Sequence, residues 1–255
     1  MAIKVGVLGA SGRMGSEVCK AVINDPDTAL VAAIDENNVG ESIASSDLCI
    51  TDDFSAVQDA DVVVDFTVAD SVRRNLPKIA ESEVHAVVGT TGLTEADIEG
   101  LKSLFKGSNC VIAPNFAISA VLMMRFSELA APHFDNVEII EYHHSSKVDA
   151  PSGTALTTAE RIGASSTMRI KNSTDNFILD GARGGVTEDG ISIHSVRMEG
   201  MVAHQDVIFG TDGQTLTIRQ DSYDRSSFMP GVLLAVKNVG NYPGITIGLE
   251  PLLNL

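Results

Sequence analysis

Residues 3–15 read Ile3-Lys4-Val5-Gly6-Val7-Leu8-Gly9-Ala10-Ser11-Gly12-Arg13-Met14-Gly15. The aliphatic run at 3–8 predicts a buried strand, and the apolar spacing over 16–23 predicts a helix. A glycine-rich turn between a strand and a helix is the setting of a dinucleotide site, because glycine lets the backbone approach a pyrophosphate at the helix N-terminus. The spacing Gly-x-x-Gly-x-x-Gly is a variant of the usual fingerprint, so a turn that binds no nucleotide is the alternative.

A second aliphatic stretch, residues 29–34, ends at Asp35. An acidic residue at the end of the second strand is where a dinucleotide fold hydrogen-bonds the adenine ribose. Asp35 would repel the 2′-phosphate of NADPH, whereas Arg13 in the glycine turn would attract it. The two residues oppose each other, so the sequence predicts that NADH and NADPH are both used, with a lean towards NADH. An ordinary loop acid is the alternative interpretation of Asp35.

Three more aliphatic stretches, at 61–67, 85–89 and 110–113, alternate with two helical patterns. The first helix, 71–82, is expected to break at Pro77. The second, 94–106, begins at the capping residue Thr94. This alternation predicts an α/β fold with a Rossmann-like, doubly wound parallel sheet. Ligands of such sheets lie beyond the carboxyl ends of the strands, which places one set of residues at the nicotinamide side: Gly89, Thr90 and Thr91.

After residue 116 the pattern changes to that of an α+β domain. An apolar helix at 118–131 precedes a strand at 137–141 and a long polar loop at 171–188, in which Arg183 is a candidate anion contact. Stretches of period two follow, with glycine turns between them: residues 191–198, 201–209 and 215–219. They predict an antiparallel or mixed sheet with one covered face, whose open face is a natural oligomer contact.

A final helix is expected over 227–239, packed back on the first domain. The sequence therefore predicts a dinucleotide-binding domain at 1–116, completed by 227–255. Residues 117–226 are expected to form a substrate-binding and oligomerisation domain.

Most of the candidate catalytic and substrate-binding residues lie at 141–154, where a strand ends and a helix begins. This stretch holds His143, His144 and Lys147, followed by the turn Pro151-Ser152-Gly153-Thr154. Ser152 is placed to cap the helix, and free N–H groups at the helix N-terminus can seat an anion. A histidine can donate a proton near neutral pH. We therefore expect a site for a small carboxylate, against the alternative of surface histidines beside an ordinary helix start.

Length, composition, net charge and cysteine content limit the class of protein to which the chain can belong. The chain has 255 residues, 44% of them hydrophobic, and a net charge of −16, which disfavours nucleic acid and anionic membranes as partners. No apolar run approaches the roughly 18 residues of a membrane span, and no leader peptide is visible. Cys19, Cys49 and Cys110 have no metal-type spacing. We expect a cytoplasmic protein with inert thiols and no metal.

Together these motifs closely resemble the 4-hydroxy-tetrahydrodipicolinate reductase (dihydrodipicolinate reductase) family of bacterial lysine and diaminopimelate biosynthesis. The resemblance spans nearly the whole chain and rests on six segments: residues 9–15, 65–67, 89–92, 113–116, 143–154 and 202–205. It implies NAD(P)H-dependent reduction of 4-hydroxy-tetrahydrodipicolinate, a dicarboxylate, to tetrahydrodipicolinate with loss of water. It also implies a homotetramer built through the sheet of the second domain.

The resemblance implies a role for each matching residue. His143 would be the proton donor, and Lys147 a second acid that also binds a substrate carboxylate. The other substrate contacts would be His144, Ser152, Gly153 and Thr154. The cofactor contacts would be Gly9, Ala10, Ser11, Gly12, Arg13, Met14, Asp35, Gly89, Thr90, Thr91, Ala113, Pro114, Asn115 and Phe116. Many relatives have a third histidine where this chain has Ser146, which makes the expected pocket less basic.

Three other functions fit parts of the pattern. A different nicotinamide enzyme on the same scaffold is one, although the semialdehyde type would need a catalytic cysteine that no motif supplies. A metal hydrolase is another, but adjacent histidines point to opposite faces of a strand and make a poor chelating pair. A non-catalytic NAD-binding sensor is the third, and the presence of both His143 and Lys147 counts against it.

Overall fold

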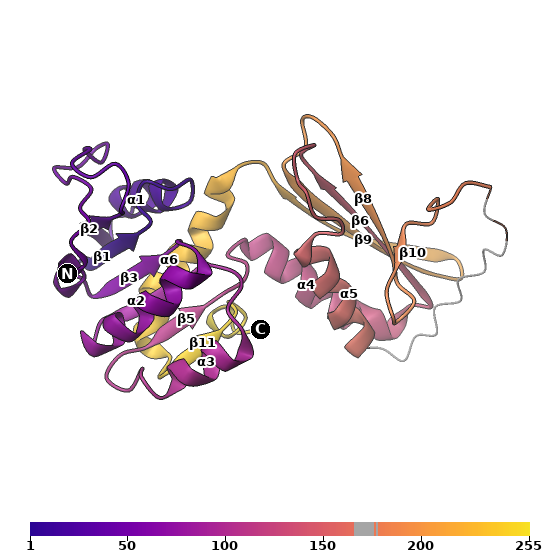
Figure 1. Ribbon diagram of the computed structural model, residues 1–255. Helices are drawn as coiled ribbons and strands as arrows, with labels where there is room; N and C mark the ends of the chain where they lie inside the picture. Colours follow the sequence, from indigo (N-terminus) through magenta and orange to yellow (C-terminus); the bar gives the residue numbers. More distant parts are fainter. Residues whose placement is uncertain (166–175, 177) are drawn as a thin grey trace. The chain divides into compact units, whose positions relative to one another are not determined.

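The computed structural model describes residues 1–165, 176 and 178–255. The chain divides into two compact units (Figure 1). The first consists of residues 1–118 and 225–255, and the second of residues 119–224. The first unit is therefore built from both ends of this sequence, with the second inserted between them.

The first unit contains a six-stranded parallel sheet, which confirms the predicted fold class. Its strand order is β11-β5-β4-β3-β1-β2, so the direction of winding reverses on the two sides of β1. Ligands bind beyond the carboxyl ends of the strands at such a reversal. The strands are β1 (Ile3–Leu8), β2 (Thr28–Ile34), β3 (Val62–Asp65), β4 (His85–Val88), β5 (Cys110–Ile112) and β11 (Ile245–Ile247).

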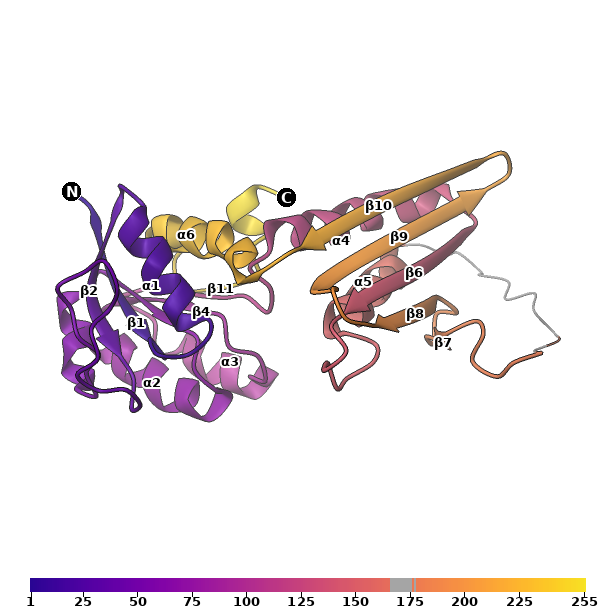
Figure 2. The same ribbon diagram turned by 90° about the horizontal axis from the view of Figure 1, so that it is seen from above.

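Helices cover both faces of this sheet (Figure 2). One pair is α1 (Gly15–Asn24) and α6 (Met229–Asn238), and the other is α2 (Ala69–Glu81) and α3 (Glu95–Lys102). Coverage on both sides explains why the strands are unbroken aliphatic runs, because neither face meets water. All four residues of β3 are buried, as are the last three of β4.

Helix α2 runs through Pro77 without interruption, so the break expected there is wrong. Proline removes only one N–H from the helix, and burial of neighbouring side chains outweighs that loss. Leu76 and Ile79, on either side of Pro77, are fully buried in the core of the unit. Helix α3 begins as predicted, since Thr94 and Asp97 form a complete capping box, but it ends at Lys102.

The second unit contains a mixed five-stranded sheet in the order β10-β9-β6-β8-β7. β6 is antiparallel to β9 and parallel to β8. Helices α4 (Ile118–Ala130) and α5 (Gly153–Ser165) lie on one face of the sheet (Figure 2). The strands are β6 (Asn136–His143), β7 (Gly185–Val186), β8 (Ser192–Arg197), β9 (Ala203–Thr211) and β10 (Gln214–Ser222).

Two short strands, β7 and β11, are not predicted from the sequence. The expected loop at 171–188 lies partly outside the described residues, and its described part contains the two-residue strand β7. At the C-terminal end of the sequence, β11 pairs with β5 and forms an edge of the parallel sheet. Strands of two or three residues are too short to show a period. No helix among the described residues is long and apolar enough to cross a bilayer.

Candidate active site

The glycine turn after β1 is closely packed against the start of α1. Gly9 has a positive φ of 79°, and a Cβ at Gly15 would lie 1.9 Å from the Gly9 carbonyl oxygen. Ala10 N–H donates to the Ile34 carbonyl, and Ser11 N–H donates to Asp35 Oδ2 at 3.0 Å. The turn is therefore fastened to the carboxyl end of β2, and these two N–H groups already have partners within the protein.

Asp35 stands where the sequence placed it, directly after β2. Its carboxylate accepts hydrogen bonds from the backbone of Ser11 and from Asn37, the latter at 2.9 Å. Partial burial acts to raise the pKa of Asp35, but these hydrogen bonds outweigh it and hold the pKa below its usual value. Asp35 is therefore an anion at neutral pH.

A cavity of about 560 Å³ opens at this edge of the first unit. Gly9 and Gly12 of the turn line it, together with Asp35 after β2. The opposite wall comes from the loop after β3 and from α2. This wall includes Phe66, Thr67, Arg74 and Lys78. A glycine turn, an anionic carboxylate and an aromatic ring therefore border one cavity, an arrangement that is typical of a dinucleotide site.

A buried carboxylate shapes the loop after β3. Asp65 is fully buried and accepts hydrogen bonds from the backbone and hydroxyl of Thr67, at 2.9 and 2.6 Å, and from the amide of Asn75 at 2.9 Å. Burial raises the pKa of Asp65, against the effect of these hydrogen bonds. Asp65 therefore anchors Thr67 at the cavity edge and connects it to α2.

The expected nicotinamide-side segments adjoin this loop. Thr90 Oγ1 donates to the Thr67 carbonyl at 3.1 Å. A Cβ at Gly89 would lie 2.1 Å from the Phe66 ring, so glycine is needed there to admit the ring. The Phe66 and Phe116 rings pack 5.7 Å apart. The structure thus brings together parts of three motifs: residues 65–67, 89–92 and 113–116.

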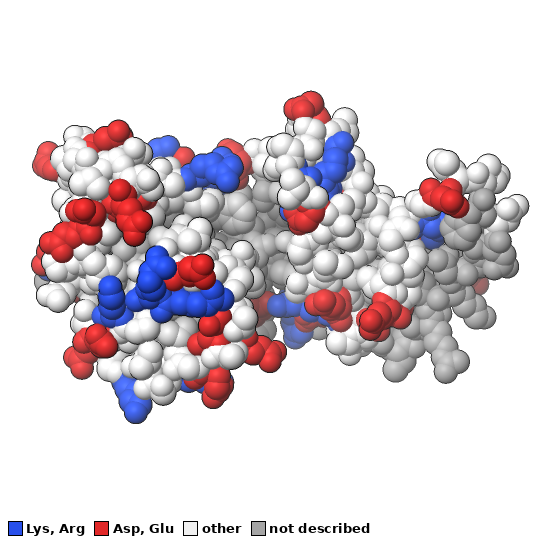
Figure 3. Space-filling model, in the orientation of Figure 1, with Lys and Arg blue, Asp and Glu red and all other residues white. Residues whose placement is uncertain are grey.

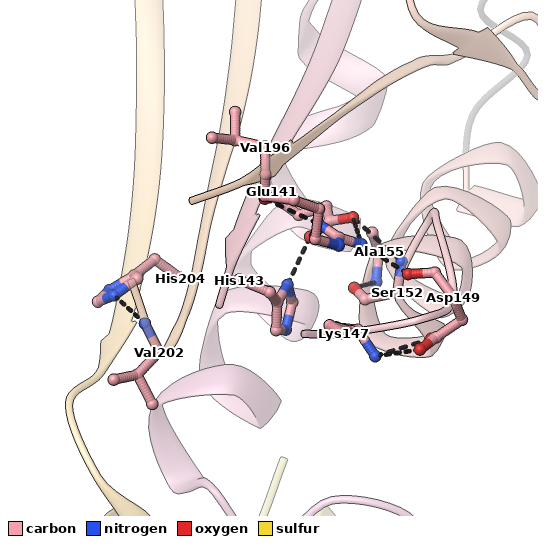
Figure 4. Close-up of polar contacts among 10 residues, drawn as sticks. Glu141, His143, Lys147, Asp149, Ser152, Ala155, Val196, Val202 and His204 are labelled. Carbon is pink, nitrogen blue, oxygen red and sulfur yellow. Dashed lines mark hydrogen bonds and ion pairs between the residues drawn. The ribbon is translucent and has the colours of Figure 1, made fainter. Parts of the chain in front are cut away.

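In the second unit, Glu141 lies at the centre of the candidate catalytic cluster. It is fully buried, and its two carboxylate oxygens each accept a hydrogen bond from Arg197 at 2.8 Å (Figure 4). Burial by itself would raise the pKa of this carboxyl. The hydrogen bonds from Arg197 and His143 outweigh burial, so the pKa of Glu141 lies below its usual value.

His143 ends β6 on the same face as Glu141, because alternate residues of a strand share a face. Its Nδ1 lies 2.5 Å from Glu141 Oε2, and Nε2 points away from that carboxylate (Figure 4). Burial is the main reason that the pKa of His143 is lowered, and Glu141 opposes the effect. The positive charges of Lys147 and Arg197 lower it further.

Lys147 is not an unpaired cation in this structure. Its Nζ lies 2.7 Å from both carboxylate oxygens of Asp149, and its side chain is only 20% exposed. His144 Nδ1 is 2.8 Å from the hydroxyl of Ser146. A carboxylate ligand would therefore compete with Asp149 for Lys147.

The N-terminus of α5 is fixed beside this cluster. Ser152 is buried, and its Oγ accepts a hydrogen bond from Ala155 N–H at 3.2 Å, so it caps the helix as predicted. Its own N–H donates to Glu141 Oε1 at 3.3 Å. Gly153 has open space where a side chain would stand. One carboxylate therefore orients both the imidazole and the first turn of α5.

Sequence reasoning missed Glu141, Arg197 and Asp149 as parts of the site. A carboxylate inside an apolar strand, two residues before His143, was the available signal for Glu141. Arg197 gave no such signal, because it reaches the site only through the pairing of β8 with β6, where it stands opposite His143.

Arg183, the candidate anion contact, and two further histidines of the second unit are paired with other carboxylates. Arg183 forms an ion pair with Glu138, and His194 Nε2 lies 2.8 Å from the same carboxylate. His204 Nδ1 lies 2.7 Å from Asp221. Among the described residues, no three His, Cys, Asp or Glu side chains are grouped so that they could hold a metal ion.

The three cysteines are free thiols. Burial raises the pKa of Cys19 to about 12 and moves that of Cys110 upwards as well. A thiol of such high pKa is not a nucleophile at neutral pH. Cys49 is exposed, and its sulfur lies 3.8 Å from the Ser42 hydroxyl.

Two family models cover almost the whole chain. Residues 3–116 match "Dihydrodipicolinate reductase, N-terminus", and residues 119–253 match "Dihydrodipicolinate reductase, C-terminus". A 4-hydroxy-tetrahydrodipicolinate reductase of Corynebacterium urealyticum is 49% identical over 99% of both chains. One of Nocardia farcinica is 48% identical over 100% of both.

Solved structures give a consistent result. The dipicolinate-bound dihydrodipicolinate reductase of Paenisporosarcina sp. TG-14 is 38% identical, with a TM-score of 0.89 over 98% of this chain and 99% of that one. A probable dehydrogenase of Thermotoga maritima has a TM-score of 0.64 at 13% identity, covering 98% of this chain and 92% of that one. That second likeness shows the fold alone.

Proposed function

Because the chain belongs to the dihydrodipicolinate reductase family, the reductases of lysine and diaminopimelate biosynthesis, we propose how its own residues carry out the reaction. The reaction is the reduction of 4-hydroxy-tetrahydrodipicolinate to tetrahydrodipicolinate with loss of water. Bound NADH or NADPH supplies the hydride. In this proposal the first unit holds the nucleotide, the second holds the substrate, and His143 supplies the proton.

The first unit fits a dinucleotide. A Cβ at Gly12 would lie 3.1 Å from the Gly9 carbonyl oxygen, so a side chain there would crowd the turn, whose glycines line the cavity. In our assignment residues 9–14 hold the pyrophosphate, and Asp35 accepts hydrogen bonds from the adenine ribose. Residues 89–91 and 113–116 line the nicotinamide side. The anionic Asp35 favours NADH, and we propose that both nucleotides are used with a lean towards NADH.

The substrate has two carboxylates, and the second unit offers matched partners. The related Paenisporosarcina enzyme was solved with dipicolinate, a flat dicarboxylate. We assign one carboxylate to the N-terminus of α5, at Ser152, Gly153 and Thr154, where backbone N–H groups and the helix dipole attract anions. Lys147 binds it as well, after exchanging Asp149 for the substrate, and His144 adds a further contact.

Proton transfer is assigned to His143. Glu141 holds Nδ1 and its negative charge stabilises the imidazolium. Nε2 is then the atom that faces the substrate. Hydride addition to a conjugated C=N system builds electron density that must be protonated, and a positioned imidazolium can do this. The incoming substrate dianion raises the pKa of His143, so substrate binding favours protonation of the imidazole. Lys147 serves as a second acid.

The observation that carries this proposal is the hydrogen-bonded chain Arg197–Glu141–His143 beside the N-terminus of α5. A surface histidine has no reason to be held at Nδ1 by a fully buried carboxylate that is itself held by an arginine. The arrangement fixes the tautomer and direction of one imidazole, as acid–base catalysis requires.

We further propose a homotetramer in the cytoplasm. Within the described part of the second unit, helices α4 and α5 cover one face of the sheet only, and strand alternation places Ile140, Tyr142 and Ile208 on the other face. An uncovered sheet face with apolar side chains favours contact between copies of the chain. Sedimentation velocity tests the assembly, because a monomer at micromolar concentration would contradict it.

The function is tested by following nicotinamide absorbance with the condensation product of pyruvate and aspartate semialdehyde, first with NADH and then with NADPH. Oxidation of the nucleotide that requires the condensation product supports the assignment. Absence of turnover with both nucleotides would refute it. The ratio of kcat/KM values measures the preference directly.

A further inference from the structure

A basic surface lies on α2, in a chain with 34 acidic and only 18 basic residues (Figure 3). Lys and Arg side chains gather over this helix, and its sequence supplies Arg73, Arg74 and Lys78. Because acids outnumber bases by nearly two to one, basic side chains have many carboxylates to pair with. A pair of basic side chains that line a cavity and have no carboxylate partner is a candidate site for an anionic ligand.

Arg73 is accounted for within the protein. It hydrogen-bonds Asp97 through two nitrogens, at 3.1 and 3.0 Å, and Asp70 through a third at 2.7 Å. It also donates to the Gly92 carbonyl at 3.0 Å. Arg73 therefore joins α2 to α3, and its charge is neutralised by two carboxylates.

Arg74 and Lys78 behave differently. They stand four residues apart, on one side of the helix, and both line the cavity that also contains Gly9, Gly12 and Asp35. Arg74 donates to the Ser71 hydroxyl at 3.0 Å, and Lys78 Nζ lies 5.1 Å from the centroid of the Phe54 ring. Within the described part of the chain, neither has a carboxylate oxygen within 4.0 Å of its side-chain nitrogens, the limit for a salt bridge.

The position of the pair along α2 selects which part of a dinucleotide it can meet. The pyrophosphate lies at the N-terminus of α1. Lys78 is nine residues beyond Ala69, the first residue of α2, which is roughly 13 Å along the helix. Residues 35–37 and Phe54 line the same cavity as Lys78. A ligand group near Lys78 would belong to the adenosine end, and two cations that line the same cavity as Asp35 suit a phosphate on the adenine ribose.

We propose that Arg74 and Lys78 form a binding site for the 2′-phosphate of NADPH, in the cavity that Asp35 also lines. The inference rests on the nucleotide site assigned under the proposed function, and names the residues that decide its specificity. Asp35 disfavours the 2′-phosphate and the α2 pair attracts it, so the two opposing contributions leave both nucleotides usable. NADH, which lacks that phosphate, is indifferent to the pair.

The test compares the full-length protein with the double variant Arg74→Gln/Lys78→Gln. Dissociation constants for NADPH and NADH are measured by nicotinamide fluorescence. Losing two charge-assisted contacts is expected to weaken NADPH binding roughly 10- to 100-fold and to leave NADH binding within about threefold. As probes of the same end, adenosine 2′,5′-bisphosphate should lose affinity in parallel, whereas 5′-AMP should not.

The matched control is Arg73→Gln, which removes a charge from the same helix but not from the cavity, and should leave the ratio of the two constants unchanged. Unchanged NADPH binding in the double variant would overturn the proposal. An equal loss for NADH and NADPH would overturn it too, since the pair would then contact a part that both nucleotides share. NADH-dependent turnover of the double variant separates these outcomes from failure of the proposed function itself.

Discussion

Glu141 and His143 stand two residues apart on one face of β6, with a carboxylate oxygen 2.5 Å from the imidazole Nδ1. The carboxylate is fully buried, while the histidine side chain is 16% exposed. The buried Glu141 therefore orients the more accessible imidazole of His143. Arg197, which neutralises Glu141, also donates to the Asp149 carbonyl at 2.7 Å and so holds the loop that carries Lys147.

Replacing Glu141 by Gln should lower kcat roughly 10- to 100-fold, because the imidazole loses the carboxylate that orients it and stabilises its charge. The KM for NADH should hardly change. Arg197, whose side chain is 18% exposed, would lose its counter-charge beside a fully buried position, so the free energy of unfolding should fall by about 3 kcal/mol. Steady-state kinetics and urea denaturation measure the two effects, and a wild-type kcat would contradict the positioning role.

His143→Ala and Lys147→Ala should each reduce turnover by roughly two to four orders of magnitude, the range typical of a lost general acid or base. Nucleotide affinity should stay at its wild-type value, since neither residue lies in the unit assigned to the nucleotide. The exposed His133 provides a matched control, and His133→Ala should leave kcat unchanged. Near-wild-type rates in both site variants would remove the proposed mechanism.

The pH dependence follows from the lowered pKa of His143. A lowered pKa means that the free enzyme carries the imidazolium only at pH values below the ordinary midpoint of 6.5. If His143 is the acid, kcat/KM falls as pH rises through that lowered pKa. Lys147→Gln removes a positive neighbour and should move the midpoint upwards. NMR titration of the His143 ring measures both, and an unchanged midpoint in the variant would refute the coupling.

Ser152→Ala tests the start of α5. Loss of the Oγ acceptor for Ala155 N–H should reduce the free energy of unfolding by about 1 kcal/mol. The KM for substrate should rise, because the same turn is assigned to a carboxylate. Ser165 lies at the other end of α5 and is exposed, so Ser165→Ala should change stability by less than about 0.5 kcal/mol. Equal effects of the two substitutions would argue against the cap.

Gly15→Ala tests the nucleotide turn, because its Cβ would lie 1.9 Å from the Gly9 carbonyl oxygen and the backbone would have to move. We expect loss of NADH binding together with a lower Tm. Gly100 in α3 has nothing within 4 Å of its Cβ position, so Gly100→Ala should raise stability by roughly 0.5–1 kcal/mol. Tight NADH binding by Gly15→Ala would show that the turn does not hold the nucleotide.

Local signals in the sequence were enough for the parallel sheet, the glycine turn and the caps at Thr94 and Ser152. Each of these depends on residues that are neighbours in the chain. Arg197 depends on strand register, and the two-residue strand β7 depends on a partner it meets only in the fold. The uninterrupted helix at Pro77 shows the same limit, because burial of Leu76 and Ile79 overrides the local preference.

The nucleotide unit is closed by residues 225–255, which follow the whole of the other unit in the chain. During synthesis, all strands of the sheet that contains β6 are made before β11, the strand that pairs with β5. The last strand of the first unit is therefore made only after the whole of the second unit. We expect a chain truncated after residue 224 to resist protease within residues 119–224 and to be cut within its first hundred residues.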